Sequence, residues 1–132
     1  ALRVRVAELA IGRGGDLTKW AKQFSLVALL GLDISRVALE ECNRRIRKGR
    51  PYPYVLLEAD MAEPGLGVGF GAGGYGAAGD KFTVVEAQKD DVLRQGLAGA
   101  FDIVAVQFAL HYAFARGAAA TAAVFDNISA LP

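Results

Sequence analysis

The residues best suited to chemistry lie in the stretch QFALHYAF (residues 107–114), which directly follows the apolar run FDIVAV. A chain that leaves a buried strand usually turns polar or reaches Gly, Pro, Asn or Asp. Here Gln107, His111 and Tyr112 stand among apolar neighbours, and His111 is the sole histidine. An amide, an imidazole and a phenol can hold a polar ligand by directed hydrogen bonds. The alternatives are a core histidine and an ordinary core aromatic ring.

Acidic side chains occur where other strands are predicted to end. Glu8, Asp33 and Asp60 each lie at or just beyond the end of an apolar, strand-like run, as Gln107 does. In open parallel sheets, ligands bind at the carboxyl ends of the strands, near the switch in strand order. We therefore expect these four polar groups to point at one crevice.

The segment AIGRGGD (residues 10–16) predicts a ligand-binding turn between a strand and a helix. Glycines let the backbone approach a ligand closely, and the first turn of a helix offers free N–H groups. Ala10, Gly12 and Gly15 approximate the spacing G-x-G-x-x-G, with Asp33 at about the distance expected of a ribose-binding acid. The pattern suits NAD and S-adenosylmethionine equally well, and it also suits a purely structural turn.

Strands and helices alternate along the chain. We expect strands over Arg3–Leu9, Leu26–Asp33, Tyr54–Glu58 and Phe101–Val106. We expect helices over Gly15–Phe24, after a cap at Ser35 with Ala38, Cys42 and Ile46 inward, and over Ala115–Ala130 with Phe125, Ile128 and Leu131 on one side. This order predicts an α/β, Rossmann-like domain with a mainly parallel sheet and flanking helices.

Length and composition fit one domain of 132 residues, and the first residues do not resemble a signal peptide. No apolar run approaches the roughly 20 residues of a membrane helix. Residues 1–50 hold eleven Lys and Arg against five acids, whereas residues 51–132 hold four against nine. The basic half favours an anionic partner such as a polyphosphate or RNA; a solvated, Arg-rich helix face is the alternative.

Three motifs carry a resemblance to a known family. VAELAIGRGGDLTKW (residues 6–20) is similar to the V-L-D-L-G-C-G-K-G-G-D-L-x-K-W motif of eukaryotic mRNA cap guanine-N7 methyltransferases. LGLDISRVALEECNRR resembles that family's second strand and next helix, and FDIVAVQFALHYAF resembles its signature F-D-x-x-x-x-Q-F-x-x-H-Y-x-F. The Q-F-x-x-H-Y element discriminates best, because general methyltransferases and dehydrogenases do not share it.

The resemblance implies a class I fold that binds S-adenosylmethionine and methylates N7 of the cap guanine by in-line displacement, without a general base or a metal. It implies a capped mRNA 5′ end as substrate, a nuclear location, and other capping enzymes as partners. It places cofactor contacts at Ala10, Gly12, Asp16, Asp33, Asp60, Gln107 and Tyr112, and cap or RNA contacts at Arg13, Lys19, Arg45 and His111. Within these sets, Asp16 lies near the cofactor's amino group, Asp33 at the ribose and Asp60 at the adenine amino group.

Several features depart from the family pattern. Glu8 replaces an Asp, and Ala10 replaces a glycine, which costs about 1–2 kcal/mol if that position has positive φ. We expect residues 1–132 to be one partial methyltransferase domain, weakly active or inactive alone, with a flexible glycine-rich insertion at about 64–80. The rival interpretations are another class I methyltransferase, a degenerate non-catalytic domain and, last, a nicotinamide dehydrogenase.

Overall fold

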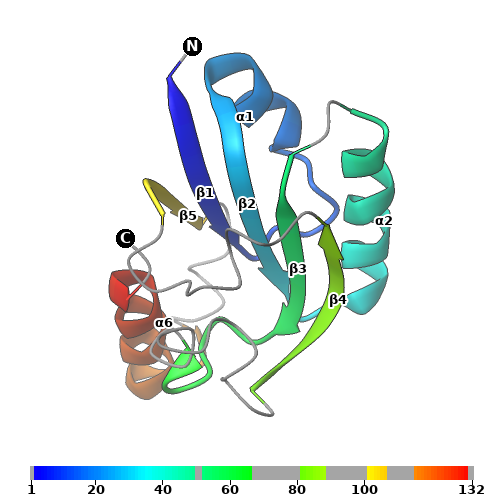
Figure 1. Cartoon of the computed structure of the whole chain (residues 1–132). Helices are drawn as coiled ribbons and strands as arrows, with labels where there is room; N and C mark the ends of the chain where they lie inside the picture. Colours follow the sequence, from blue (N-terminus) through cyan, green and yellow to red (C-terminus); the bar gives the residue numbers. More distant parts are fainter. Residues whose placement is uncertain (1, 50–51, 67–80, 89–100, 107–114, 131–132) are drawn as a thin grey trace.

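The computed structural model describes residues 2–49, 52–66, 81–88, 101–106 and 115–130. Within them a five-stranded sheet has the order β4-β3-β2-β1-β5 (Figure 1). The strands are β1 (Arg3–Leu9), β2 (Ser25–Asp33), β3 (Tyr54–Ala59), β4 (Phe82–Gln88) and β5 (Ile103–Val106). All neighbouring pairs are parallel except β3 and β4. The predicted mainly parallel α/β architecture is confirmed.

Two helices connect the central strands. α1 (Leu17–Gln23) lies between β1 and β2, and α2 (Arg36–Arg47) lies between β2 and β3. Ser35 caps α2 as predicted, since its Oγ accepts the Ala38 N–H at 3.2 Å. The buried stripe of α2 contains Leu39, Cys42 and Ile46, one helical face that packs on the sheet.

The sheet is covered on both faces. On one face the α1 and α2 side chains Trp20, Leu39 and Cys42 pack with Val4 and Val6 of β1. On the other face lie residues that pack with Ala7 and Leu9 of the same strand, namely Leu66, Phe101 and Ile128 of α6 (Ala118–Ala130). Because β1 alternates between the two clusters, it is buried on both faces, as a central parallel strand should be.

The last helix differs from its prediction. Gly117, at φ 104, precedes α6, so the helix begins at Ala118 rather than Ala115. Its buried face contains Val124 and Asn127, whereas Phe125 is 46% exposed. Asn127 Nδ2 donates to two main-chain oxygens at 2.9 Å, those of Met61 and Glu63, which fixes α6 against the segment after β3.

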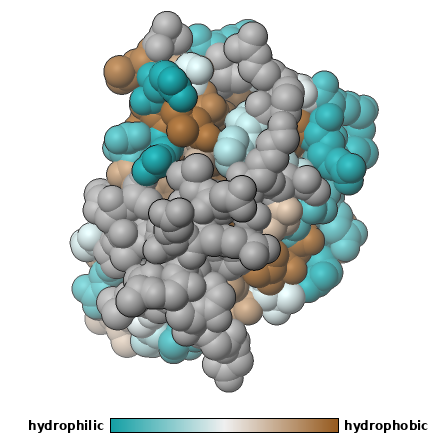
Figure 2. Space-filling model, in the orientation of Figure 1, coloured by the Kyte–Doolittle hydropathy of each residue, from teal (hydrophilic) through white to brown (hydrophobic). Residues whose placement is uncertain are grey.

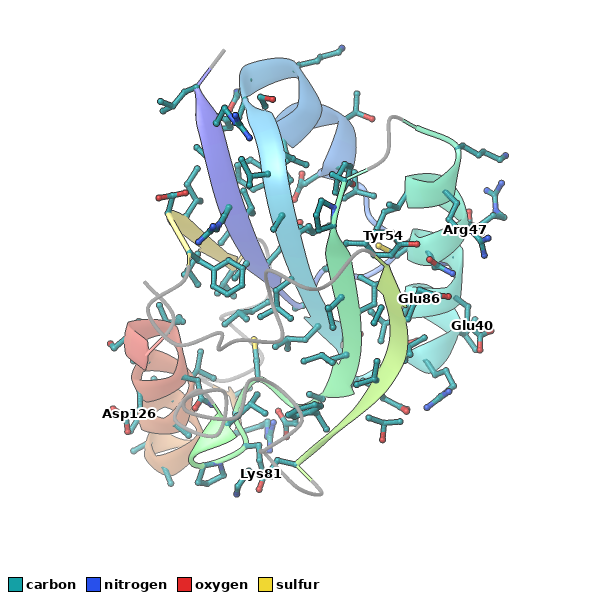
Figure 3. The ribbon with its side chains drawn as sticks, in the orientation of Figure 1. Glu40, Arg47, Tyr54, Lys81, Glu86 and Asp126 are labelled. Carbon is teal, nitrogen blue, oxygen red and sulfur yellow. The ribbon has the colours of Figure 1, made fainter. Side chains whose placement is uncertain are left out.

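The edge strand β4 was not predicted from the sequence. It pairs antiparallel with β3, and Val85 is an extra residue where the register shifts. A polar chain joins this edge to α2: Tyr54 donates to Asn43 Oδ1, and Asn43 Nδ2 donates to Glu86 Oε2 at 3.2 Å (Figure 3). The glycine-rich stretch from 67 to 80 lies outside the described residues, so its predicted role as an insertion stays a prediction.

Candidate functional site

The turn after β1 is docked onto the end of β2. Ile11 N–H donates to the Leu32 carbonyl at 2.9 Å, and Gly12 N–H donates to Asp33 Oδ2 at 2.8 Å. Ala10 and Gly12 both have left-handed backbones, with φ 58 and φ 59. The condition under which alanine at position 10 carries a strain cost is therefore met. These bonds give the turn a fixed shape with its backbone close to the carboxyl end of β2.

Asp33 connects two backbone segments. Its Oδ2 binds the turn, while its Oδ1 accepts the Ser35 N–H at 2.9 Å as the chain enters α2. An ionised carboxylate offers about four acceptor positions. Two remain on the half-buried Asp33 for a ligand such as a diol. A Cβ built on Gly12 would meet nothing within 4 Å, so open space lies directly over the turn beside this carboxylate.

Glu8 is buried one residue before the end of β1, with 2% of its surface exposed. Trp20 Nε1–H donates to Glu8 Oε2 at 3.1 Å, which links the strand to α1. Burial raises the pKa of Glu8 to about 7; the Trp20 bond opposes this rise, and a hydrogen bond and charge repulsion from Asp16 add to it. Asp16 in turn lies 3.9 Å from Lys19 Nζ.

Asp60 follows β3 and has different partners. Its Oδ1 accepts the Ala62 N–H at 2.9 Å, and Arg116 Nη1 lies 3.1 Å from Oδ1 and 3.0 Å from Oδ2. Burial alone would raise the pKa of Asp60, but the bonds and charge of Arg116, with the Ala62 N–H, hold that pKa below its usual range. Both carboxylate oxygens therefore already have a cationic neighbour.

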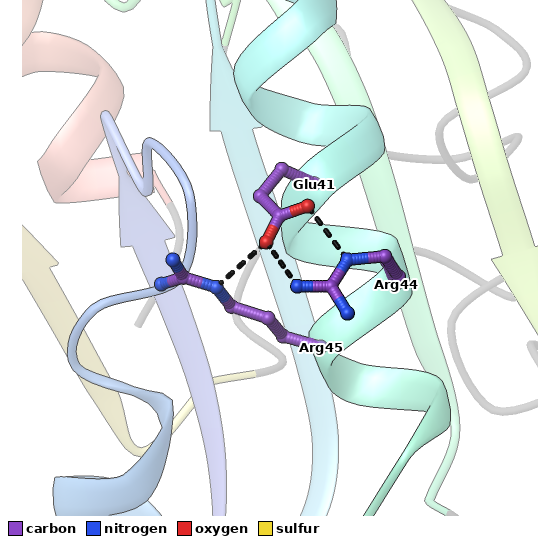
Figure 4. Close-up of polar contacts among 3 residues, drawn as sticks. All are labelled: Glu41, Arg44 and Arg45. Carbon is purple, nitrogen blue, oxygen red and sulfur yellow. Dashed lines mark hydrogen bonds and ion pairs between the residues drawn. The ribbon is translucent and has the colours of Figure 1, made fainter.

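The basic residues predicted to meet phosphate lie on the face covered by α1 and α2. Arg13 is exposed in the turn, Lys19 is on α1, and Arg45 is in the last turn of α2. Arg45 Nε donates to Glu41 Oε1 at 3.1 Å, and Arg44 holds both Glu41 oxygens (Figure 4). Figure 2 shows hydrophilic residues gathered along the side where α2 lies. Arg45 therefore already has a carboxylate partner, Glu41, before any phosphate binds.

The structure brings together only part of the predicted constellation. Gly12 N–H binds Asp33, and Ala10 and Asp16 belong to the same turn as Gly12. The β2–β3 register places Asp33 opposite Glu58, two residues before Asp60. Gln107, His111 and Tyr112 lie outside the described residues, so their predicted roles stay predictions. Sequence reasoning missed Trp20 and Arg116. Trp20 is part of the first motif and could have been found there, whereas nothing in the local sequence singles out Arg116.

Comparison with known proteins decides the family. The sequence model of the mRNA (guanine-N(7))-methyltransferase domain matches residues 1–131. The chain belongs to the mRNA (guanine-N(7))-methyltransferase family.

Curated relatives agree with this methyltransferase assignment. The chain is similar to mRNA cap guanine-N(7) methyltransferase 1 of Arabidopsis thaliana, at 32% identity over 96% of this chain and 29% of the relative. It is 33% identical to the mRNA cap guanine-N(7) methyltransferase of Saccharomyces cerevisiae over 83% of the chain and 20% of the relative. The Drosophila melanogaster enzyme of that name is 30% identical over 84% and 22%. The chain therefore spans less than a third of these relatives.

The residues of this methyltransferase-family chain fit S-adenosylmethionine unequally. At the β1–β2 end, Asp33 keeps free acceptor positions and Gly12 faces open space, which suits a ribose and a closely approaching chain. At the β3 end, Asp60 would have to share its oxygens with Arg116 to accept an adenine amino group. Among the described residues, no helix is long and apolar enough to cross a membrane, and no three His, Cys, Asp or Glu are placed to hold a metal.

Proposed function

We propose that the protein containing this chain transfers a methyl group from S-adenosylmethionine to N7 of the guanine cap of mRNA. The observation that carries the proposal is Asp33, held between Gly12 N–H and Ser35 N–H with open space over Gly12, in a chain of this family. The curated relatives that match most of the chain are named for this activity, which supports the proposal.

Asp33 would accept hydrogen bonds from the ribose hydroxyls, because an ionised carboxylate accepts from both members of a diol. Gly12 and Ala10 would lie against the methionine part, where the turn approaches most closely, and Asp16 would meet its amino group. Asp16 suits this role because its side chain makes no cap bond to α1 and is only partly exposed beside Lys19. Asp60 would meet the adenine amino group, and Gln107 and Tyr112 would close the pocket.

The chemical step needs alignment more than acid–base catalysis. The cofactor, when bound, supplies an electrophilic methyl on sulfur, and guanine N7 already presents an exposed lone pair. Positioning the two in line can lower a barrier by roughly 7–11 kcal/mol. His111 and Tyr112 would position the guanine and the cofactor, and acceptors near the guanine edge would favour its developing positive charge. No residue of the chain is then required to take a proton.

The triphosphate of the cap would lie along Arg13, Lys19 and Arg45, whose side chains are exposed on the α1 and α2 face. One guanidinium group can donate two parallel hydrogen bonds to two phosphate oxygens. Arg45 would exchange its bond to Glu41 for one to phosphate. The protein would act on nascent transcripts in the nucleus, alongside the other enzymes that build the cap.

Methyl transfer to GpppA-capped RNA, measured as N7-methylguanosine released by nuclease digestion, tests the proposal on the native protein. We expect cap-dependent product, and a loss of at least about tenfold in Asp33→Asn. Asp102→Asn is the matched control: Asp102 also accepts a backbone N–H, that of Arg5 at 2.8 Å, but it lies at the start of β5, away from the turn. S-adenosylhomocysteine binding without cap methylation would favour another class I methyltransferase, and no binding would favour a degenerate domain.

A further inference from the structure

Two arginines of α2 meet at one carboxylate, that of Glu41. Arg44 binds it with two bonds: Nε donates to Oε2 at 2.7 Å, and Nη2 donates to Oε1 at 2.5 Å. Arg45 reaches the same carboxylate with Nε alone, at 3.1 Å from Oε1 (Figure 4). Two parallel bonds from one guanidinium are stronger and more directional than a single bond. Glu41 is therefore held mainly by Arg44.

The unused donors of Arg45 lie on the other side of its guanidinium group. Within the part of the chain that the structure describes, its terminal nitrogens Nη1 and Nη2 have no acceptor. Figure 4 shows these two nitrogens on the edge turned away from Glu41. Arg44, by contrast, spends Nε and one terminal nitrogen on the carboxylate. Arg45 thus keeps more donors for an anionic ligand than Arg44 does.

Arg45 lies on the side of α2 that is next to the turn of residues 10–16. A Cβ built on Gly14 of that turn would lie 3.0 Å from Cys42 Sγ. Residues three apart on a helix are neighbours on its surface, so Arg45 is one helical turn from this contact. Arg13, the other arginine proposed for the triphosphate, directly precedes Gly14 in the chain. Arg44 has no such link to the turn.

We propose that Arg44 is a positioning residue for cap binding, because it retains Glu41 when Arg45 leaves that carboxylate for the cap phosphates. This inference rests on the proposed function, since it takes the cap triphosphate as the ligand of Arg45. With Arg44 in place, the departure of Arg45 breaks one bond and leaves Glu41 with two bonds and a neutralising charge. Without Arg44, Glu41 would compete more strongly for Arg45, and its uncompensated charge would repel the phosphates.

Glu41 competes for Arg45 at any pH near neutrality. The hydrogen bonds from Arg44, opposed by partial burial and followed by the bond from Arg45, lower the pKa of Glu41 to about 2. Glu41 is therefore ionised under assay conditions, and protonation does not release Arg45 from it. The charge of Arg44 is then what balances Glu41 while Arg45 is bound to phosphate.

Equilibrium binding of a fluorescently labelled GpppA-capped RNA, followed by anisotropy on the native protein with S-adenosylhomocysteine, measures this effect. We expect Arg44→Gln to raise the dissociation constant about threefold, the size typical of one exposed ion pair. Adding Glu41→Gln to that variant should restore wild-type affinity, because the competitor for Arg45 is then gone. Arg47→Gln is the matched control: it removes an exposed positive charge of α2 outside the Glu41 cluster (Figure 3), and it should change affinity by less than about twofold.

Steady-state methylation separates positioning from damage to the fold. Arg44→Gln should raise KM for capped RNA about threefold, while kcat and KM for S-adenosylmethionine stay at their wild-type values. A merely structural role in α2 would instead lower thermal stability, and adding Glu41→Gln would not restore KM. The double-mutant cycle between positions 41 and 44 therefore reports the competition for Arg45 directly.

Three results overturn the inference and leave the proposed function intact, since wild type still binds and methylates the cap. The first is an unchanged dissociation constant in Arg44→Gln. The second is a loss that persists alongside Glu41→Gln, which would mean that Arg44 contacts phosphate itself. The third is an equal loss in Arg47→Gln, which would reduce the effect to net charge. A wild-type protein that neither binds nor methylates capped RNA overturns both the inference and the proposed function.

Discussion

Acidic residues lie in equivalent places at two corners of the sheet, but their hydrogen-bond partners differ. The β1–β2 corner consists of Glu8, the turn 10–16 and Asp33; the β3–α6 corner consists of Asp60, residues 61–63 and Arg116. In the first, Asp33 binds backbone N–H groups on both sides, at 2.8 Å and 2.9 Å. In the second, Asp60 binds one backbone N–H at 2.9 Å and a guanidinium 56 residues away in the sequence. The first corner is built from adjacent segments, and the second depends on a distant side chain.

This difference has energetic consequences. Hydrogen bonds from backbone N–H groups to a charged carboxylate fix the conformation of the backbone. An exposed ion pair adds little to stability, because water solvates its two charged groups well when they are apart. Arg116 is 55% exposed and Asp60 is 35% exposed, so solvent screens their attraction. We therefore expect the β1–β2 corner to hold its shape without a ligand, and the β3–α6 corner to adjust when one binds.

The largest expected effect concerns pH. Glu8 has a pKa raised, chiefly by burial, from 4.5 to about 7, so the folded chain binds more protons than the unfolded chain between those values, and stability falls as pH rises through them. Glu8→Gln removes this dependence and should raise the free energy of unfolding at pH 8 by up to about 3 kcal/mol relative to wild type, measured by urea denaturation. The β3–α6 corner behaves oppositely: Asp60, with its lowered pKa, loses its contribution only in acid. Equal pH profiles for wild type and Glu8→Gln would contradict this assignment.

The next effect compares the two aspartates directly. Asp33→Ala deletes the acceptor for Gly12 N–H and Ser35 N–H, and should lower the free energy of unfolding by about 2 kcal/mol. Asp60→Ala removes one backbone bond and an exposed ion pair, and should cost about 1 kcal/mol or less. The midpoints of denaturant unfolding, compared between variants that have equal m-values, show which substitution lowers stability more. The comparison fails if Asp60→Ala proves the more damaging.

The β1–β2 corner is also held by close packing beneath the turn. A Cβ at Gly31 would lie 2.7 Å from Ile11 Cδ1 and 2.9 Å from Leu56 Cδ2, so Gly31→Ala forces both side chains to move and should cost about 1.5 kcal/mol. Gly15→Ala is the matched control, because a Cβ there meets nothing within 4 Å and the residue has no positive φ. Thermal denaturation of the two variants should show a clear loss for position 31 and little change for position 15.

A smaller effect, of opposite sign, is expected at Ala10. Its φ of 58 is a left-handed conformation that costs an alanine roughly 1–2 kcal/mol. Glycine removes this strain, but it also makes the unfolded chain more flexible, which offsets part of the gain in stability. Ala10→Gly should therefore stabilise the protein by about 0.5–1 kcal/mol in chemical denaturation. A loss of stability in this variant would mean that the methyl group makes contacts worth more than the strain.

The sequence could predict the β1–β2 corner because its determinants are local. The glycine turn, the acid that ends β2 and the Ser35 cap each follow a short sequence pattern that marks the end of a strand or the start of a helix, and each was confirmed in place, although the bond between Gly12 and Asp33 joins residues 21 apart. The β3–α6 corner could not be predicted in the same way, since Arg116 carries no local pattern and α6 begins where Gly117 takes φ 104. The β4 strand was missed for a related reason: it is an antiparallel edge whose partner β3 is set by the sheet, not by its own short run of β-branched residues.

The smallest expected effect tests whether the Arg116–Asp60 pair matters to stability at all. A double-mutant cycle with Arg116→Gln and Asp60→Asn should give a coupling energy of about 0.5 kcal/mol that shrinks as salt is added, because both side chains are substantially exposed. The same Arg116→Gln variant should bind S-adenosylhomocysteine at least as tightly as wild type, since it releases both Asp60 oxygens for the adenine amino group. A coupling energy well above 1 kcal/mol would make this corner as rigid as the other, and Arg116 would then be a fixed part of the fold and not a side chain that the ligand displaces.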